Sequence, residues 1–238
     1  MFGVTSPLYE DLVYNREEGG TRRNILVAGT SGSGKSVILN GLINSILYED
    51  AAKHQIALID LKIVEFSKYK NLPHCIGCAT SARETEYLLT HIINTIKTRL
   101  TEMEKRGSTN FTEQDGPIIH LIVDEMAELM LDGKECANQL QRICQIGRAA
   151  GVQVVCATQC PLASVIPTRI KVNFQITIGL HTRTAQDSRN ILEENGCEKL
   201  PMYGQALIVK PGKATEKIDV PMIPAEWLEK IIAYRMAT

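Results

Sequence analysis

The chain has 238 residues, of which 44% are hydrophobic and 22% are charged, a balance typical of one large globular domain. Its 26 basic and 27 acidic residues give a net charge of −1, which excludes a protein that coats nucleic acid through a general basic surface. No apolar run approaches the roughly 18–20 residues of a membrane span and the N-terminus lacks a signal-peptide pattern, so we expect a cytoplasmic protein.

Short apolar runs alternate with longer segments that have apolar residues at helical spacing. In chain order, the predicted elements are a strand at 24–28, a helix at 36–49, a strand at 55–60, a helix at 83–106, a strand at 118–123, a helix at 134–150, strands at 152–157 and 174–180, a helix at 185–195, a strand at 205–209 and a helix from 224. This alternation predicts an α/β fold with a mainly parallel sheet flanked by helices.

Three parts are expected along the chain. Residues 1–21 are polar and predict an irregular lead-in, residues 22–220 form the main domain, and residues 221–238 form a helical tail. Gly151 is expected as a left-handed cap after the helix at 134–150.

The cysteines are seven in number and lie mostly in apolar segments, as reduced and buried thiols do. Cys75 and Cys78 have the spacing of a metal or redox pair. Zinc would need a second such pair, and His74 alone does not complete a site, so we interpret both cysteines as packing residues.

A glycine-rich segment between the first strand and the first helix fits the pattern G-x-x-x-x-G-K-[ST] at every position. Its backbone N–H groups and the start of the helix would cradle the phosphates of ATP. Lys35 would reach the β- and γ-phosphates, and the Ser36 hydroxyl would ligate Mg²⁺. The predicted nucleotide-binding residues are Gly29, Thr30, Ser31, Gly32, Ser33, Gly34, Lys35, Ser36 and Val37.

Two carboxylates follow the strand at 118–123, where an apolar run would deliver them to the sheet edge beside the phosphate loop. Asp124 is predicted to hold the Mg²⁺ shell, and Glu125 to act as the general base toward the attacking water. Gln159 ends the strand at 152–157 and is predicted to sense the γ-phosphate or to orient water. Having both carboxylates favours hydrolysis over binding alone.

These motifs together resemble the FtsK/SpoIIIE family of DNA translocases over most of the chain, from about Arg22 to Val209. The similar segments are 26–37, 59–62, 65–69, 72–74, 122–130, 147–152, 157–159 and 187–189 with 191–192 and Gly196, in the family's order. The family usually has proline at position 61 and arginine at position 160, where this chain has Leu61 and Cys160.

The resemblance implies a RecA-like P-loop domain that assembles into a ring, expected to be hexameric, with ATP at subunit interfaces and double-stranded DNA in the pore. It also implies an arginine supplied by a neighbouring subunit, for which Arg148 is the first candidate and Arg189 and Arg183 follow. Arg148 is alternatively a helix C-terminal residue that interacts with the helix dipole.

The phosphate backbone of DNA would be held by loops facing the pore, and residues 105–116 and 160–171 are the candidates, the latter with Arg169 and Lys171. The alternative interpretation, that both loops are ordinary surface connections, is equally compatible with the sequence. The family's membrane domain and winged-helix domain are not expected in this chain, so a membrane-bound or DNA-recruiting partner would be needed.

Two other functions remain open. FtsK-like modules also serve type VII protein secretion, and the nucleotide motifs do not separate a protein substrate from DNA. A nucleotide-dependent scaffold that barely hydrolyses ATP is the third alternative; Glu125 argues against it, whereas Cys160 leaves it open.

Overall fold

The computed structural model describes residues 6–14, 22–131, 133–159 and 165–237. The strands of these ranges are β1 Ile25–Ala28, β2 His54–Ile59, β3 Cys75–Ala79, β4 Ile118–Val123, β5 Val152–Thr158, β6 Ile176–Gly179, β7 Gln205–Val209 and β8 Glu216–Asp219. The α-helices are α1 Pro7–Tyr14, α2 Lys35–Leu47, α3 Ala82–Lys105, α4 Met126–Leu131, α5 Lys134–Ile146, α6 Thr168–Lys171, α7 Ala185–Leu192 and α8 Ala225–Ala237. Short 3₁₀ turns lie at Ser67–Tyr69, Glu113–Asp115, Gly147–Ala150 and Cys197–Lys199.

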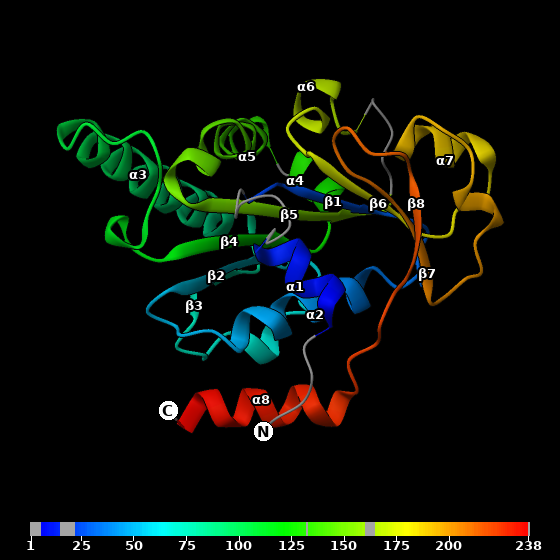
Figure 1. The fold of residues 1–238 in the computed structure, drawn as a ribbon, viewed down its shortest axis with the longest axis horizontal. Helices are drawn as coiled ribbons and strands as arrows, with labels where there is room; N and C mark the ends of the chain where they lie inside the picture. The colour runs from blue at the N-terminus through cyan, green and yellow to red at the C-terminus, as the bar shows by residue number, and fades with distance from the viewer. Residues whose placement is uncertain (1–5, 15–21, 132, 160–164, 238) are drawn as a thin grey trace.

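The strands form one sheet in the order β3-β2-β4-β5-β1-β6-β7-β8 (Figure 1). Neighbours from β3 to β6 are parallel, whereas β7 and β8 pair antiparallel. The predicted mainly parallel α/β fold is therefore confirmed. Because β1, β4 and β5 are adjacent and parallel, their carboxyl ends meet at one edge of the sheet, where ligands bind in open α/β folds.

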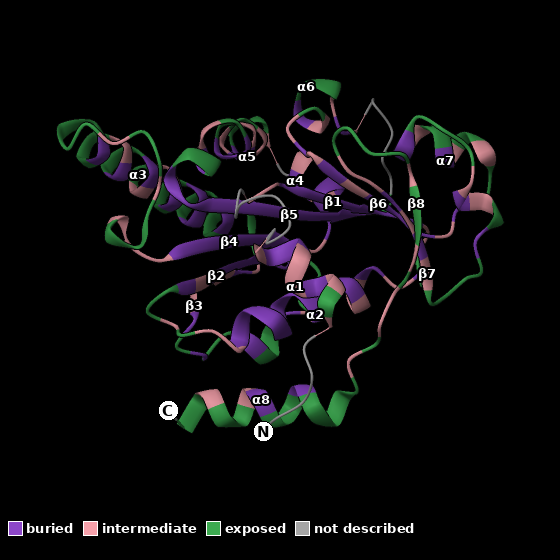
Figure 2. Cartoon of the chain, in the orientation of Figure 1, coloured by how far each residue is buried: buried purple, intermediate pink, exposed green. Residues whose placement is uncertain are grey.

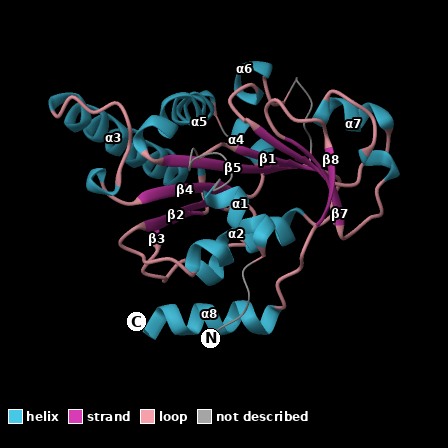
Figure 3. Ribbon diagram, viewed as in Figure 1, coloured by secondary structure: helices cyan, strands magenta, loops and turns pink. Residues whose placement is uncertain are grey.

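Helices cover both faces of the sheet, with α1, α2 and α8 on one side and α3, α5 and α6 on the other (Figure 3). Side chains along a strand point alternately to the two faces. In β1, Ile25 and Val27 pack toward α2, whereas Leu26 packs toward α3 and α5. The central strands are buried on both faces, as parallel strands usually are (Figure 2).

The prediction of an irregular lead-in is wrong for Pro7–Tyr14, which form α1. Tyr9, Leu12 and Val13 are buried, and the Tyr9 hydroxyl donates to the Pro221 carbonyl at 2.6 Å. A Cβ on Gly41 of α2 would lie 2.3 Å from the Tyr9 ring, so glycine is what allows the two helices to pack this closely. The other residues of the predicted lead-in, apart from Ser6, lie outside the described residues.

Two strands were not expected from the sequence. β3 is an edge strand that carries the free thiols of Cys75 and Cys78, and burial raises the pKa of Cys78 to about 11. β8 is the opposite edge and has mostly exposed charged residues, so it shows no apolar alternation. The predicted cap is confirmed: Gly151 has φ 74°, after a 3₁₀ turn that follows α5.

A buried polar chain fastens α1 to the amino-terminal side of the sheet. His54 Nδ1 lies 3.1 Å from His120 Nε2, and His120 Nδ1 lies 2.8 Å from Gln153 Oε1. The Gln153 amide then donates to the carbonyls of Leu12 at 3.0 Å and Arg23 at 2.9 Å. This hydrogen-bonded network links β2, β4 and β5 to α1 and to the segment that enters β1.

Among the helices of the described ranges, none is long and apolar enough to cross a membrane.

Candidate nucleotide-binding site

The glycine-rich loop joins β1 to α2 at the carboxyl edge of the parallel strands, as the sequence predicts. Its backbone is fixed to the neighbouring strand ends: the Gly29 N–H donates to the Thr158 carbonyl at 3.3 Å, and the Thr30 N–H donates to the His181 carbonyl at 3.0 Å. Helix α2 begins directly after Gly34. The free N–H groups and the positive dipole end of α2 therefore face this loop, an arrangement that favours a bound anion.

The loop needs glycine for two separate reasons. Gly32 and Gly34 have φ angles of 75° and 103°, in the left-handed region that side chains disfavour. At Gly29, a Cβ would lie 2.7 Å from the Leu180 Cβ and 2.7 Å from the Ser33 Oγ. The first cause is conformational and the second is close packing against the end of β6.

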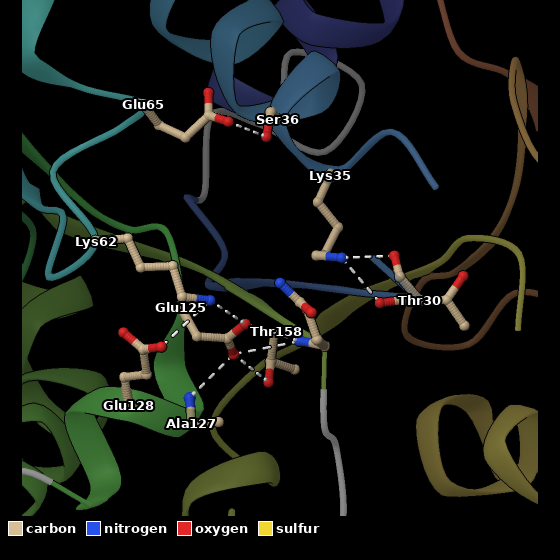
Figure 4. Close-up of polar contacts among 11 residues, drawn as sticks. Thr30, Lys35, Ser36, Lys62, Glu65, Glu125, Ala127, Glu128 and Thr158 are labelled. Carbon is tan, nitrogen blue, oxygen red and sulfur yellow. Dashed lines mark hydrogen bonds and ion pairs between the residues drawn. The ribbon is translucent and has the colours of Figure 1, made fainter. Parts of the chain in front are cut away.

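The Lys35 ammonium is buried inside the loop. Its Nζ donates to the Gly29 carbonyl at 2.9 Å and the Thr30 carbonyl at 2.8 Å (Figure 4). Burial lowers the pKa of Lys35, and the nearby charges of Glu125 and Asp124 oppose that fall. Since an ammonium has three donors, these two bonds leave one donor for an anion in the pocket.

Ser36, Glu65 and Asp124 line one side of the pocket. The Ser36 hydroxyl donates to Glu65 Oε1 at 2.6 Å. Burial, followed by the charges of Glu65, Asp60 and Glu125, raises the pKa of Asp124 to about 6. Asp60 Oδ1 is also buried and has no hydrogen-bond partner among the described residues. The Ser36 hydroxyl and the Asp124 carboxylate are oxygen donors of the kind that Mg²⁺ prefers, and they fit a cation that takes its remaining ligands from water and phosphate.

The Glu125 carboxylate is only 7% exposed, and its two oxygens have different surroundings. Oε1 accepts from the Thr158 hydroxyl at 2.9 Å, the Gln159 N–H at 3.2 Å and the Ala127 N–H at 3.3 Å. Oε2 shares the Gln159 N–H at 3.2 Å and lies 3.7 Å from the Lys62 Nζ. One oxygen is thus saturated by donors, whereas the other is held weakly.

Lys62 is a cation of the site that follows β2. Its Nζ lies 3.3 Å from Glu128 Oε1 as well as near Glu125 (Figure 4). Burial alone would lower the pKa of Lys62, but the hydrogen bond with Glu128 and the charges of Glu125 and Asp124 raise it. Lys62 therefore remains charged beside the carboxylates of the site.

These residues surround an open pocket of about 420 Å³, a size in the usual range for small-molecule sites. Its lining residues are Ser31, Gly32, Gly34, Lys35, Ser36, Val37, Lys62, Val64, Glu65, Asp124 and Gln159. The structure thus brings the predicted phosphate loop, Asp124 and Gln159 to one pocket. Glu125 lies behind this lining, next to Lys62 and Gln159.

The model of the FtsK/SpoIIIE family matches residues 3–118, which include the glycine-rich loop. DNA translocase FtsK of Staphylococcus epidermidis is 36% identical over 232 residues, which cover 89% of this chain and 29% of that protein. DNA translocase FtsK of Agrobacterium fabrum is 32% identical over 253 residues, which cover 89% of this chain and 28% of that protein. The chain belongs to the FtsK/SpoIIIE family. It spans about three tenths of the length of these curated relatives.

Solved structures with the same fold are ATPases and their relatives. The pCW3 conjugation coupling protein TcpA, solved as a monomer with ATPγS, has a TM-score of 0.77 and 25% identity over 90% of this chain and 65% of that one. The cytoplasmic domain of the type VII secretion ATPase EccC of Thermomonospora curvata has a TM-score of 0.77 and 20% identity over 92% of this chain and 28% of that one. The family and these neighbours support nucleotide binding and ATPase activity for the FtsK/SpoIIIE-type domain.

The arginines that the family resemblance suggests lie in different places. Arg148 is exposed at the amino end of β5, whereas Gln159 follows its carboxyl end. The seven residues of β5 separate them by about 20 Å, so Arg148 does not reach the pocket of its own chain. Arg183 is exposed after β6, and Arg189 donates to Asn195 at 2.6 Å and to Gln186 at 2.9 Å. The role of any of them in a neighbouring subunit stays a prediction.

The first predicted DNA loop, residues 105–116, lies before β4 and so at the amino edge, away from the pocket. Arg106 pairs with Asp115, the Thr112 N–H donates to Asp115 at 2.7 Å, and Phe111 lies 5.3 Å from the Arg99 guanidinium. In the second loop, residues 160–164 lie outside the described residues. Of its two cations, Lys171 donates to the Asn190 carbonyl at 2.7 Å and Arg169 is exposed. The DNA contacts of this FtsK/SpoIIIE-type domain therefore stay predictions.

Sequence reasoning placed neither Lys62 nor Glu65 in the site, although both belong to segments of the family resemblance. The available signal was their position just after β2, since charged residues that follow adjacent parallel strands meet at one edge. Thr158, whose hydroxyl donates to Glu125, belongs to the similar segment 157–159, but the sequence alone gives it no role.

Proposed function

We propose that this chain is the ATP-hydrolysing motor domain of a DNA translocase, which moves double-stranded DNA through a ring of identical subunits, in the favoured form a hexamer. The observation that carries the proposal is the meeting of Asp124, and of Glu125 just behind it, with the phosphate loop at one sheet edge. The DNA translocases to which this chain is related supply the substrate class. A DNA substrate would place the domain in the cytoplasm.

The residues of the pocket divide the chemistry of hydrolysis among them. Lys35 and the N–H groups of the loop would bind the β- and γ-phosphates, and Ser36 and Asp124 would hold Mg²⁺. When bound, Mg²⁺ neutralises phosphate charge and aligns the terminal phosphate. Glu125 would accept a proton from the water whose oxygen attacks the γ-phosphorus while the bond to the bridging oxygen breaks. Gln159 would orient that water.

A ring is favoured by where the remaining charges lie. Arg148 is exposed on the edge opposite its own pocket, so it can stabilise a transition state only at the pocket of a neighbouring subunit. The net charge of −1 also argues against tight DNA binding by a single copy. Contacts repeated around a pore would offset this weakness by multivalency.

Steady-state ATPase measurements at several protein concentrations, with and without long double-stranded DNA, test the proposal. We expect a rate that rises more steeply than the protein concentration and is multiplied by DNA, with Lys35→Ala as the inactive control. A rate that is raised by a secreted peptide and not by DNA would favour the type VII alternative, whose EccC neighbour shares the fold. If the chain does not hydrolyse ATP even at high protein concentration, the result would favour the third alternative, a nucleotide-dependent scaffold.

A further inference from the structure

The loop after β2 contacts both halves of the nucleotide site. Lys62 is paired with the Glu125 and Glu128 carboxylates, and three residues later Glu65 accepts the Ser36 hydroxyl at 2.6 Å (Figure 4). Ser36 and Glu125 are the residues assigned above to Mg²⁺ and to the attacking water. The loop after β2 therefore binds Ser36 and Glu125, two residues that must contact Mg²⁺ and the attacking water during hydrolysis.

Lys62 lies next to Oε2 of Glu125, the oxygen of that carboxylate that can accept a proton. Oε1 already accepts three hydrogen bonds, so a base would have to work through Oε2. A general base needs the water within about 2.6–3.2 Å of that oxygen. The Lys62 Nζ lies 3.7 Å from Oε2, so a water that hydrogen-bonds to Oε2 would compete with this cation.

Lys62 also has a place to remain when it leaves Glu125. Glu128 is the closer of its two partners, at 3.3 Å against 3.7 Å, and its side chain is 39% exposed. The Lys62 side chain is itself 37% exposed and lines the pocket. Surface cations on long side chains change partners readily, because exposed ion pairs are weak. A phosphate group in the pocket would attract this cation away from Glu125.

The backbone next to Lys62 is in an unfavourable conformation. Ile63 has φ 59°, which a β-branched residue rarely adopts, and its side chain is 62% exposed. The turn is held by Asp60, whose Oδ2 accepts the N–H groups of Glu65 and Phe66, each at 2.9 Å. Conformations of this kind cluster in segments that switch between states. The unfavourable backbone at Ile63 therefore lies directly beside the residue whose movement is inferred below.

From these contacts we infer that Lys62 is a positioning residue of the site: it covers Oε2 of Glu125 before ATP binds and moves to the terminal phosphate when ATP is present. Its departure would uncover the base only when a γ-phosphate is there to be attacked. The inference rests on the proposed function in one respect, that Glu125 is the base. It adds that ATP is distinguished from ADP by a lysine after β2.

The test is the affinity of the full chain for ATPγS and for ADP in the presence of Mg²⁺, measured by displacement of a fluorescent nucleotide. Lys62→Met keeps the length of the side chain and removes its charge. We expect it to weaken ATPγS binding by roughly 10- to 100-fold, the loss of one hydrogen bond to a charged group, and to change ADP binding much less. Lys62→Arg should restore most of the preference for ATPγS.

Equal losses for ATPγS and ADP, or no loss for either, would overturn the inference. A purely structural Lys62 would lower kcat and leave KM for ATP nearly unchanged, whereas the inferred role raises KM by the factor seen in binding. These outcomes are separate from those of the translocase proposal. If the wild-type chain binds both nucleotides but its ATPase rate does not change with DNA, translocation is contradicted. The comparison of ATPγS and ADP affinities still tests the role of Lys62.

Discussion

Strands β2, β4 and β5 lie side by side, and polar groups gather at both of their ends. At the carboxyl ends, Lys62, Asp124 and Gln159 line an open pocket. At the amino ends, His54, His120 and Gln153 are buried and bonded to one another. The same three strands therefore carry a set of groups open to a ligand at one end and a closed network at the other.

The closed network fixes its own proton positions. Gln153 uses its amide N–H₂ to donate to backbone carbonyls, so its Oε1 must accept from His120 Nδ1. His120 Nε2 is then the acceptor for the N–H at His54 Nδ1. Both rings are neutral, and a second proton on His120 would place two N–H groups against each other.

The carboxyl ends have no comparable closure. Asp124 has a raised pKa because it is buried among other carboxylates, and Asp60 keeps a buried oxygen without a hydrogen-bond partner in the described part of the chain. Lys62 divides itself between two acids. The difference indicates that the amino end serves stability and the carboxyl end is prepared for a charged ligand.

The largest expected effect is that of Glu125→Gln on turnover. Glutamine keeps an oxygen for the Thr158 and Gln159 donors but cannot accept a proton, so kcat should fall by about 10²–10⁴ while nucleotide affinity stays near the wild-type value. Steady-state ATPase and nucleotide-binding assays check both. Glu128→Gln is the matched control and should lower kcat far less. A kcat of the Glu125→Gln variant equal to that of the wild type would contradict the role of Glu125 as the general base.

Lys35→Ala should abolish tight nucleotide binding, because the buried ammonium inside the phosphate loop is lost. The expected loss is on the order of 2–5 kcal/mol of binding free energy, measured by titration with a fluorescent nucleotide. Lys53→Ala is the control at the amino edge, where Lys53 is exposed and pairs with Glu113, and it should bind like the wild type. Micromolar ATP affinity retained by Lys35→Ala would contradict the assigned cradle.

Acid should weaken the fold through the histidine pair. Burial lowers the pKa of His54 to about 4 and that of His120 to about 3, below the ordinary value of 6.5. Between these pKa values the two histidines bind protons in the unfolded chain but not in the folded chain. The free energy of unfolding therefore falls as the pH drops from about 6.5 toward 4 and 3. Each histidine contributes a slope of about 1.4 kcal/mol per pH unit.

Urea denaturation at several pH values between 7 and 4.5 measures this slope. Replacing both residues, as His54→Gln with His120→Gln, should flatten it, whereas replacing the exposed His91 by Gln should leave it unchanged. A wild-type stability that does not vary over this range would show that the network is not closed to protons.

The smallest expected effect concerns the docking of α1. Gly41→Ala places a Cβ against the Tyr9 ring and should cost about 1–3 kcal/mol of unfolding free energy, partly offset by about 1 kcal/mol of helix propensity. Denaturant unfolding measures it. In a Tyr9→Ala background the same change should not destabilise further, because the ring is gone. Gly41→Ala with unchanged nucleotide affinity would support a separation between the two ends, and a large loss of affinity would contradict it.

Local sequence patterns were sufficient for the phosphate loop. The glycine and lysine spacing directly after an apolar strand predicts its place, and the structure has it between β1 and α2. Asp124 and Gln159 were also predictable, because each follows a strand that pairs in parallel with its neighbours. These predictions need only a strand, its direction and the residue after it.

Contacts that depend on several elements at once could not be predicted in this way. The His120 and Gln153 pair exists because β4 and β5 align these residues in register. Lys62 precedes Ile63, whose left-handed backbone no propensity favours, so no local pattern predicts the turn that follows Lys62. Helix α1 has only three buried residues, too few for a periodic signal, and its place is set by the shape of α2 at Gly41.

Displacement of a labelled third strand from a DNA duplex tests the central claim, that the carboxyl-edge pocket drives movement along DNA. We predict ATP-dependent release with a lag that grows with the length of duplex to be crossed, and no release by Glu125→Gln. ATP hydrolysis by the wild-type chain without any release, on duplexes of every length, would contradict a DNA motor.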